Sequence, residues 1–108
     1  MKALAPIKRG DTFEINGQLL ADQVTNTPFD LTGYTVRSQL RGTDGLIQEL
    51  TATITDAPNG RYKISATPAQ TVAWPIATLS TDIEFTSRNG KKMTTETMSL
   101  PVMRKETQ

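Results

Sequence analysis

The stretch FDLTGYTVRSQLR, residues 29–41, joins a turn to a strand. The Asp30 carboxylate can accept hydrogen bonds from backbone N–H groups a few residues further on, and Gly33 can adopt a positive φ. From Tyr34 the side chains alternate between two faces, which is the period of a half-buried strand. The apolar face holds Tyr34, Val36 and Leu40, and the polar face holds Thr35, Arg37, Gln39 and Arg41. The stretch therefore predicts a turn that leads directly into a strand with one face in the core.

The same alternation continues on both sides of this stretch. Alternating runs cover residues 11–22, 34–41, 47–55, 61–66, 79–86 and 92–102. Turn signals rich in Gly, Asn, Asp and Pro fall at residues 42–45, 56–60 and 87–90, whereas residues 23–28 indicate a loop, 1–7 a tail and 104–108 a frayed end. Each strand has one apolar face to bury, and most connections are too short for a parallel crossover. The pattern therefore predicts an antiparallel, two-layer β-protein.

Three positions interrupt the alternation. Gly17 falls on the apolar face of the first run and indicates either a bulge or a close crossing. Glu96 falls on the apolar face of the last run, so either a bulge changes the parity there or the apolar face begins only at Met98. Ser38 lies on the apolar face of residues 34–41, where we expect it to fill space beside a partner strand.

A helix signal follows the fourth strand. Thr67 is a good N-cap, Pro68 suits the first helical position, and Gln70 can complete a capping box. Pro75 ends this helix after roughly two turns, because the residue before a proline is pushed out of the α region. We expect Trp74, the only tryptophan, to close one end of the core.

The composition agrees with a single β-domain. The chain has 108 residues, with threonine at eighteen positions, and this β-branched residue suits the solvent face of a sheet. We expect one domain over residues 1–108 with an ordered core of about residues 9–102. The net charge of +1 favours neither nucleic acid nor a membrane as partner. The absence of cysteine and of a signal-like apolar run suits synthesis in a cytoplasm.

Few residues suggest catalysis. The chain has no histidine and no cysteine, so nucleophilic chemistry that depends on either is excluded, and only a Ser–Lys arrangement stays open. Asp82 and Glu84 lie two residues apart on one strand face, a geometry that carboxylate chemistry or a hard cation could use. We favour the simpler interpretation, in which they form the solvated face of a strand. No cofactor or metal site is expected, since neither turn with Asp44 or Asp56 has the calcium-loop spacing.

Residues 9–11 spell Arg-Gly-Asp, a known cell-adhesion tripeptide. Because three residues match easily by chance, we interpret them as the entry to the first strand. The basic pairs at residues 8–9, 91–92 and 104–105 could contact phosphate, but they lack interleaved aromatic residues. Lys91 and Lys92 also fit the use of charge to discourage pairing at an exposed strand edge.

Several stretches together resemble a known group of proteins. They are RGDTF at 9–13, FDLTGYTVRSQLR at 29–41, ITDAPNGRYKIS at 54–65, TPAQTVAWP at 67–75 and LSTDIEFTSRNGK at 79–91. They are similar to small β-sandwich structural proteins of tailed bacteriophages and prophages, including the N-terminal domain of baseplate upper proteins. The resemblance implies an all-β, antiparallel, immunoglobulin-like β-sandwich of about six to seven strands with one short helical turn near residues 68–73. It brings no catalytic residues with it.

The resemblance also implies a function in assembly. We expect a non-enzymatic virion protein of the tail, baseplate, neck or capsid surface, made in the bacterial host cytoplasm. Its expected partners are other virion proteins and itself, as a homo-oligomer, through an outward surface formed by Arg37, Gln39 and Arg41. The alternative is a carbohydrate-binding adhesion module at the host surface. That function needs exposed aromatic rings, and the alternation leaves only Phe29 and Trp74 for it.

Overall fold

The computed structural model describes residues 2–106, and most of them lie in strands. The strands are β1 (Lys2–Ala3), β2 (Ile7–Lys8), β3 (Phe13–Gln18), β4 (Leu20–Asp22), β5 (Thr27–Pro28), β6 (Thr35–Gly42), β7 (Gly45–Asp56), β8 (Arg61–Ala66), β9 (Thr78–Thr86), β10 (Lys92–Thr94) and β11 (Met98–Met103). A 3-10 turn, η1 (Ala57–Asn59), precedes β8, and a helical turn, α1 (Pro68–Thr71), follows it.

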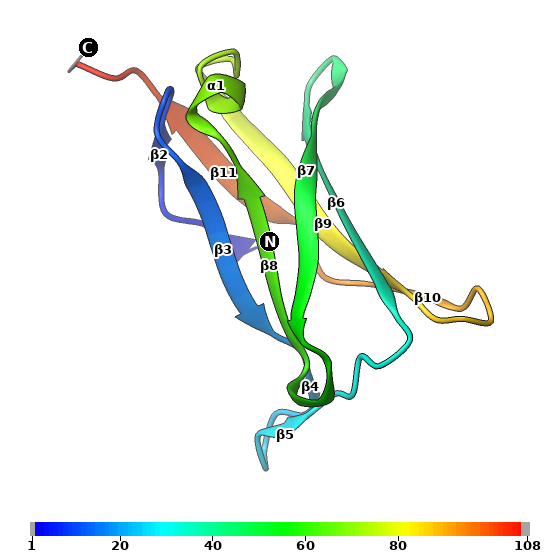
Figure 1. Cartoon of the computed structure of the whole chain (residues 1–108). Coiled ribbons are helices and arrows are strands. Elements are labelled where there is room, and N and C mark those ends of the chain that lie inside the picture. The colour runs from blue at the N-terminus through cyan, green and yellow to red at the C-terminus, as the bar shows by residue number, and fades with distance from the viewer. Residues whose placement is uncertain (1, 107–108) are drawn as a thin grey trace.

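The larger sheet has the strand order β1-β11-β9-β6-β7-β8-β3, with β2 also on β11 and β10 also on β9. Strand β7 pairs with β6 through its first half and with β8 through its second half, so it carries the sheet around the core. Figure 1 shows the curled sheet, in which β3 lies beside β2 while β4 and β5 form a separate small hairpin. The predicted all-β fold is confirmed, in a form between a sandwich and a nearly closed barrel.

The prediction of a purely antiparallel sheet is wrong at the N-terminus. Strands β1 and β2 both run parallel to β11, with Lys2 opposite Met98 and Ile7 opposite Val102. The tail predicted at residues 1–7 is therefore paired over its described part, and residue 1 lies outside the described residues. Two-residue strands are too short to show an alternation in the sequence. Their pairing partner, β11, also lies far along the chain, so local sequence does not reveal it.

Residues 29–41 form the turn and strand predicted from their sequence. The Asp30 carboxylate accepts hydrogen bonds from the backbone N–H of Thr32 at 2.9 Å and from its hydroxyl at 2.6 Å. Gly33 has a φ of +83°, and Leu31 inside the turn is fully buried. Strand β6 follows and lies in the middle of the sheet, between β7 and β9.

Two predicted strands are interrupted. The first run divides at Leu19 into β3 and β4, and β4 pairs with β5 in a region predicted as a loop. The last run divides into β10 and β11. Between them, the Thr95 N–H donates to the Ile83 carbonyl at 2.9 Å, and the Thr95 hydroxyl accepts from the Ile83 N–H at 3.0 Å. Glu96 is exposed, so the apolar face begins at Met98, as one of the two alternatives predicted.

The core lies inside the curled sheet. Its buried apolar residues are Ile7, Phe13, Leu31, Leu40, Leu50, Ile64, Ala66, Trp74, Leu79, Ile83, Phe85, Met98, Leu100 and Val102. Trp74 is 1% exposed and meets Phe13 edge to face, which confirms that it closes one end of the core. The capping box of α1 is present, with Thr67 and Gln70 in reciprocal hydrogen bonds, but the helix is one turn shorter than predicted and ends at Thr71.

Ser38 is buried on the inner face of β6, as expected for a space-filling residue. Its hydroxyl donates to the Asp82 carbonyl at 2.8 Å and lies 3.0 Å from the Thr81 hydroxyl. These bonds satisfy the polar atoms of both buried side chains, which would otherwise cost free energy in the core. The Ser38 hydroxyl is therefore held between two strands.

Candidate assembly surface

The three residues predicted as an assembly surface lie together on the outer face of β6. Arg37, Gln39 and Arg41 alternate with inward Ser38 and Leu40, so the period of the strand places them on one side of the sheet. Both arginines are exposed and Gln39 is half-buried. Because β6 is flanked by β7 and β9, side chains from both neighbours border this row.

Glu49 of β7 connects the three residues. Arg37 donates from Nε and Nη2 to the two Glu49 carboxylate oxygens, each at 3.1 Å, in a bidentate pair. Gln39 Nε2 donates to Glu49 Oε1 at 2.8 Å, and Arg41 Nη2 donates to Gln39 Oε1 at 2.7 Å. We call Arg37, Gln39, Arg41 and Glu49 the β6 polar row. Its hydrogen bonds link the four side chains into one network.

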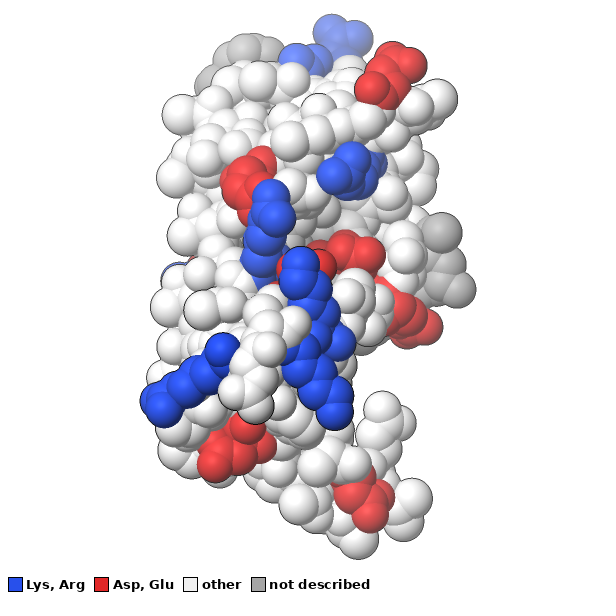
Figure 2. Space-filling model, turned by 90° about the vertical axis from the view of Figure 1, so that its right-hand side faces the viewer, with Lys and Arg blue, Asp and Glu red and all other residues white. Residues whose placement is uncertain are grey.

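Strand β9 contributes carboxylates on the other side of the row. Arg37 is opposite Glu84 and Gln39 is opposite Asp82 in the antiparallel register, and Lys92 Nζ lies 3.8 Å from a Glu84 oxygen. Asp82 and Glu84 therefore lie on a strand face, as predicted, beside cationic side chains. Figure 2 shows basic and acidic side chains near one another on the side of the molecule where β6, β7 and β10 are drawn at the right of Figure 1.

Hydrogen bonds within the β6 polar row shift the pKa values of Glu49 and Arg37. Hydrogen bonds, first from Arg37 and then from Gln39, hold the pKa of Glu49 below its ordinary value. The hydrogen bond to Glu49 in turn raises the pKa of Arg37. Both groups stay charged at neutral pH, so the surface presents an ion pair with the Arg41 guanidinium hydrogen-bonded at its end.

We expect the Glu49 carboxylate to titrate by NMR below an ordinary glutamate, and its midpoint to rise in Arg37→Ala. The Arg61→Ala variant removes an arginine that lies opposite Asp56, seven residues along β7 from Glu49, and should leave the titration midpoint in place. Since the folded pKa is depressed, the stabilisation is present above the unfolded pKa and is lost as pH falls through the folded one. Exposed ion pairs contribute only about 0–1 kcal/mol, so the midpoint is the sensitive measurement. An unchanged midpoint in Arg37→Ala would contradict the proposed pairing.

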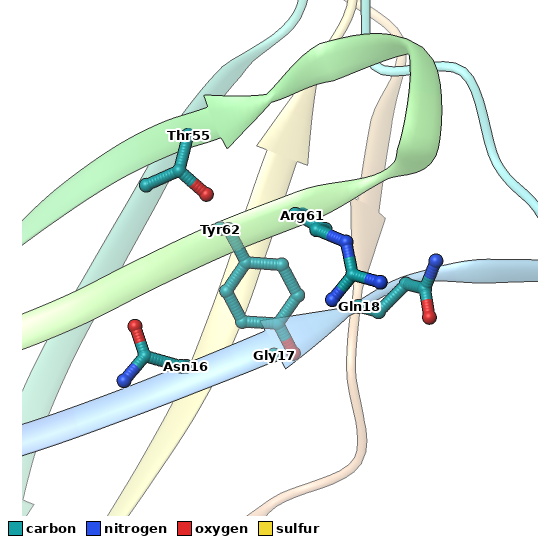
Figure 3. A pocket seen from close by; sticks show the side chains of 6 residues that line it. All are labelled: Asn16, Gly17, Gln18, Thr55, Arg61 and Tyr62. Carbon is teal, nitrogen blue, oxygen red and sulfur yellow. The ribbon is translucent and has the colours of Figure 1, made fainter.

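A hollow of about 280 Å³ lies over β3 and β8 and is lined by Asn16, Gly17, Gln18, Thr55, Arg61 and Tyr62 (Figure 3). Gly17 permits the Tyr62 ring to pack directly on the backbone, since a Cβ there would collide with the ring. This is the close crossing that the sequence left open. The ring also meets Phe85 edge to face, with centroids 5.4 Å apart. Tyr62 is thus used in packing against β3 and the core.

The two aromatic residues that the sequence left for carbohydrate binding both pack against other rings. Trp74 is buried in the core, and half-buried Phe29 packs edge to face on Tyr34, with centroids 5.6 Å apart. Stacking on a sugar needs an accessible ring face, which the buried Trp74 does not offer. No arrangement in the described residues favours the adhesion alternative.

The Arg9-Gly10-Asp11 segment is engaged within the chain. Arg9 donates to the Val72 carbonyl from Nε at 3.2 Å and from Nη2 at 2.8 Å. Asp11 forms an ion pair with Lys105 at 2.7 Å. The buried Thr71 hydroxyl accepts from the Gly10 N–H and donates to the Asp11 carbonyl. These contacts support the interpretation of the segment as the turn that leads into β3.

Within residues 2–106, no three His, Cys, Asp or Glu side chains come together as a metal site. The same part of the chain contains no helix long and apolar enough to cross a membrane.

Comparison with solved structures identifies the fold. Seventeen chains match, and one of them is the N-terminal domain of phage TP901-1 ORF48. The match has a TM-score of 0.65 at 18% sequence identity and covers 94% of this chain and 85% of that chain. No protein-family profile matches the sequence, and no curated protein matches it. The resemblance to small β-domains of tailed-phage proteins is thus confirmed in the fold.

Proposed function

We propose that the chain is a non-enzymatic structural protein of a phage or prophage virion. It acts in tail, baseplate, neck or capsid-surface assembly through protein–protein contacts. The observation that carries this proposal is the fold shared with a domain of a phage protein over nearly the whole chain. The stretches of the sequence that resemble phage structural proteins support the same function. The protein would be made in the host cytoplasm and would end in the virion.

The absence of histidine and cysteine from the sequence agrees with a role in contacts rather than chemistry. Ser38 is hydrogen-bonded inside the core, which leaves it unsuited to attack a substrate. Asp82 and Glu84 border the β6 polar row, where Glu84 lies opposite Arg37 and near Lys92 and Asp82 lies opposite Gln39. We therefore assign these carboxylates to surface electrostatics.

The β6 polar row is the surface that we assign to a partner. It combines charged groups with an ordered hydrogen-bond network, and electrostatic complementarity of this kind contributes specificity and association rate. Its strand is held on both sides within the sheet, so the row has a rigid support. The partners would be other virion proteins and further copies of this chain, with no contribution from nucleic acid or membrane.

Replacement of Arg37, Gln39 and Arg41 by alanine together should reduce binding to a virion partner by roughly tenfold or more, as loss of about 1.4 kcal/mol implies. The fold should persist, because the row is on the solvent side of the sheet. The double variant Arg61→Ala, Arg104→Ala removes the same number of positive charges, two, at other positions and serves as the matched control. Co-sedimentation with phage subassemblies measures the effect. Equal binding by both variants would show that residues 37, 39 and 41 do not form the binding surface.

A further inference from the structure

Opposite charges are sorted between two neighbouring strands of the sheet. The charged residues of β6 are Arg37 and Arg41, and those of β9 are Asp82 and Glu84. All four lie on the outer face, where the alternation of each strand places them. Strands β6 and β9 lie side by side (Figure 1), so a positive column lies beside a negative column.

Two hollows lie along the boundary between these columns. One, of about 60 Å³, is bordered by Arg37 on one side and by Glu84 on the other. The next, of about 200 Å³, is bordered by Arg41 on one side and by Ser80 and Asp82 on the other. Each hollow therefore offers hydrogen-bond donors from β6 and carboxylate acceptors from β9 to a facing surface.

The charged groups have hydrogen-bonding capacity beyond their contacts within the chain. A guanidinium has five N–H groups, and the β6 polar row uses two of those of Arg37 and one of those of Arg41. Glu84 lies 3.8 Å from Lys92, which is longer than a hydrogen bond. A facing arginine can therefore bind the Glu84 carboxylate without breaking a hydrogen bond between Glu84 and Lys92.

We propose that this face pairs with the same face of a second copy, about a two-fold axis that runs along the boundary between β6 and β9. Rotation about that axis places β6 of each copy over β9 of the other. Arg37 then faces Glu84 of the second copy, and Gln39 faces Asp82, in the order set by the register of the two strands. Each contact occurs twice, because a two-fold interface is isologous.

The charge pattern selects this axis. A two-fold axis in the same plane but perpendicular to the strands would also align the strands of the two sheets, as face-to-face packing prefers. It would place β6 over β6, with the positive column facing a positive column, and like charges across an interface are unfavourable. The axis along the strands places opposite charges over one another, so the surface complementary to this face is the same face of a second copy.

The shape of the sheet limits the contact to these two strands. The sheet curls around the core, so its outer face is convex and two copies meet only along the strands nearest the axis. The pair uses one face of each copy, so larger assemblies can be built from pairs. The proposal rests on the assembly function above and names a second copy as the partner of the β6 polar row.

Reversal of single charges tests the contact between copies. Arg37→Glu and Glu84→Arg each place like charges opposite one another in a pair of identical copies. By sedimentation equilibrium, each should self-associate about tenfold more weakly than the unmodified protein, or more weakly still. In an equimolar mixture the two variants complement each other, and the dissociation constant should return to within about threefold of the unmodified value. Mixing restores no opposite-charge pair within either chain, so this rescue reports contact between copies.

A second exposed ion pair provides the matched control. Lys63 of β8 lies 3.4 Å from Glu14 of β3, on strands away from the proposed axis. Lys63→Glu and Glu14→Lys change the net charge by the same amounts as the two test variants. Each should self-associate as the unmodified protein does.

Cross-linking tests the same contact with every charge in place, should a charge reversal impair folding. Thr35 and Thr86 are opposite one another, one outward pair beyond Arg37 and Glu84 in the register. The chain has no cysteine of its own, so Thr35→Cys mixed with Thr86→Cys should give covalent dimers on mild oxidation. Thr43→Cys, in the exposed turn between β6 and β7, replaces Thr35→Cys as the control and should give only background.

The outcomes separate this contact from the general function. A mixture of Arg37→Glu and Glu84→Arg that associates no better than either variant, while the unmodified protein associates, would overturn the two-fold contact and leave assembly standing. A protein that is monomeric by itself yet joins phage subassemblies would also overturn the contact only. A monomer that joins nothing would overturn both proposals.

Discussion

Trp74→Ala is expected to destabilise the protein by about 3–5 kcal/mol, the usual cost of removing a large buried aromatic side chain. The indole is 1% exposed and packs on Phe13 with ring centroids 5.6 Å apart at an interplanar angle of 69°. Its Nε1 lies 3.5 Å from the Gln48 side-chain oxygen. A domain of this size has a total stability of only about 5–15 kcal/mol, so the variant should be close to unfolding at room temperature.

Urea denaturation followed by circular dichroism measures this loss, because the variant has no tryptophan fluorescence. Trp74→Phe keeps a ring against Phe13 and should lose less than half as much. Val72→Ala, two residues away and on a side chain that is 53% exposed, should be nearly neutral. A loss below about 1 kcal/mol for Trp74→Ala would mean that this end of the core is not closed by the indole.

Gly60→Ala is expected to cost about 3 kcal/mol or more, because left-handed backbone strain of about 1–2 kcal/mol adds to overpacking of about 1–3 kcal/mol. Gly60 has a φ of +68° at the end of η1. A Cβ there would lie against the Leu19 carbonyl oxygen and 2.6 Å from the Phe29 carbonyl oxygen. Both are backbone atoms at the base of the β4–β5 hairpin, so neither can move aside like a flexible side chain.

Gly90→Ala is the matched control for this variant. Gly90 has a φ of +80°, but a Cβ there would meet no atom within 4 Å. It should therefore lose only the backbone part of the cost. The difference between the two variants, measured by denaturation under the same conditions, isolates the close approach of three chain segments at Gly60. Equal losses would show that this crossing is looser than the structure indicates.

Local interactions explain which parts of the fold could be predicted from the sequence. The Asp30 turn, the capping box at Thr67 and the whole of β8 depend on residues close together in the chain, and each occurs where predicted. The parallel pairing of β1 and β2 with β11 joins segments separated by most of the chain, and two-residue strands leave no periodic signal. The strands of the β4–β5 hairpin are similarly short, with three and two residues.

The residues of the candidate site on β6 could be predicted from local alternation, whereas their partner on β7 could not. Alternation along β6 places Arg37, Gln39 and Arg41 on one outward face. Their shared partner Glu49 could not be identified, because a register shift lies between Leu40 and Arg41. Without that shift, counting back from the turn at residues 42–45 pairs Gln39 with Gln48 and places Glu49 opposite the buried Ser38. The bulge places Glu49 opposite Gln39, on the same face as the polar row. No local sequence pattern predicts this bulge.

The most direct test of the assembly proposal is the mass of the purified protein, by light scattering, alone and with neighbouring phage gene products. The chain has a mass of 11.8 kDa. We predict a species of several times that mass, or its incorporation into a larger particle, and a shift toward smaller species when Arg37, Gln39 and Arg41 are replaced by alanine. A species that remains at 11.8 kDa under every condition and joins no virion subassembly would contradict the proposed function.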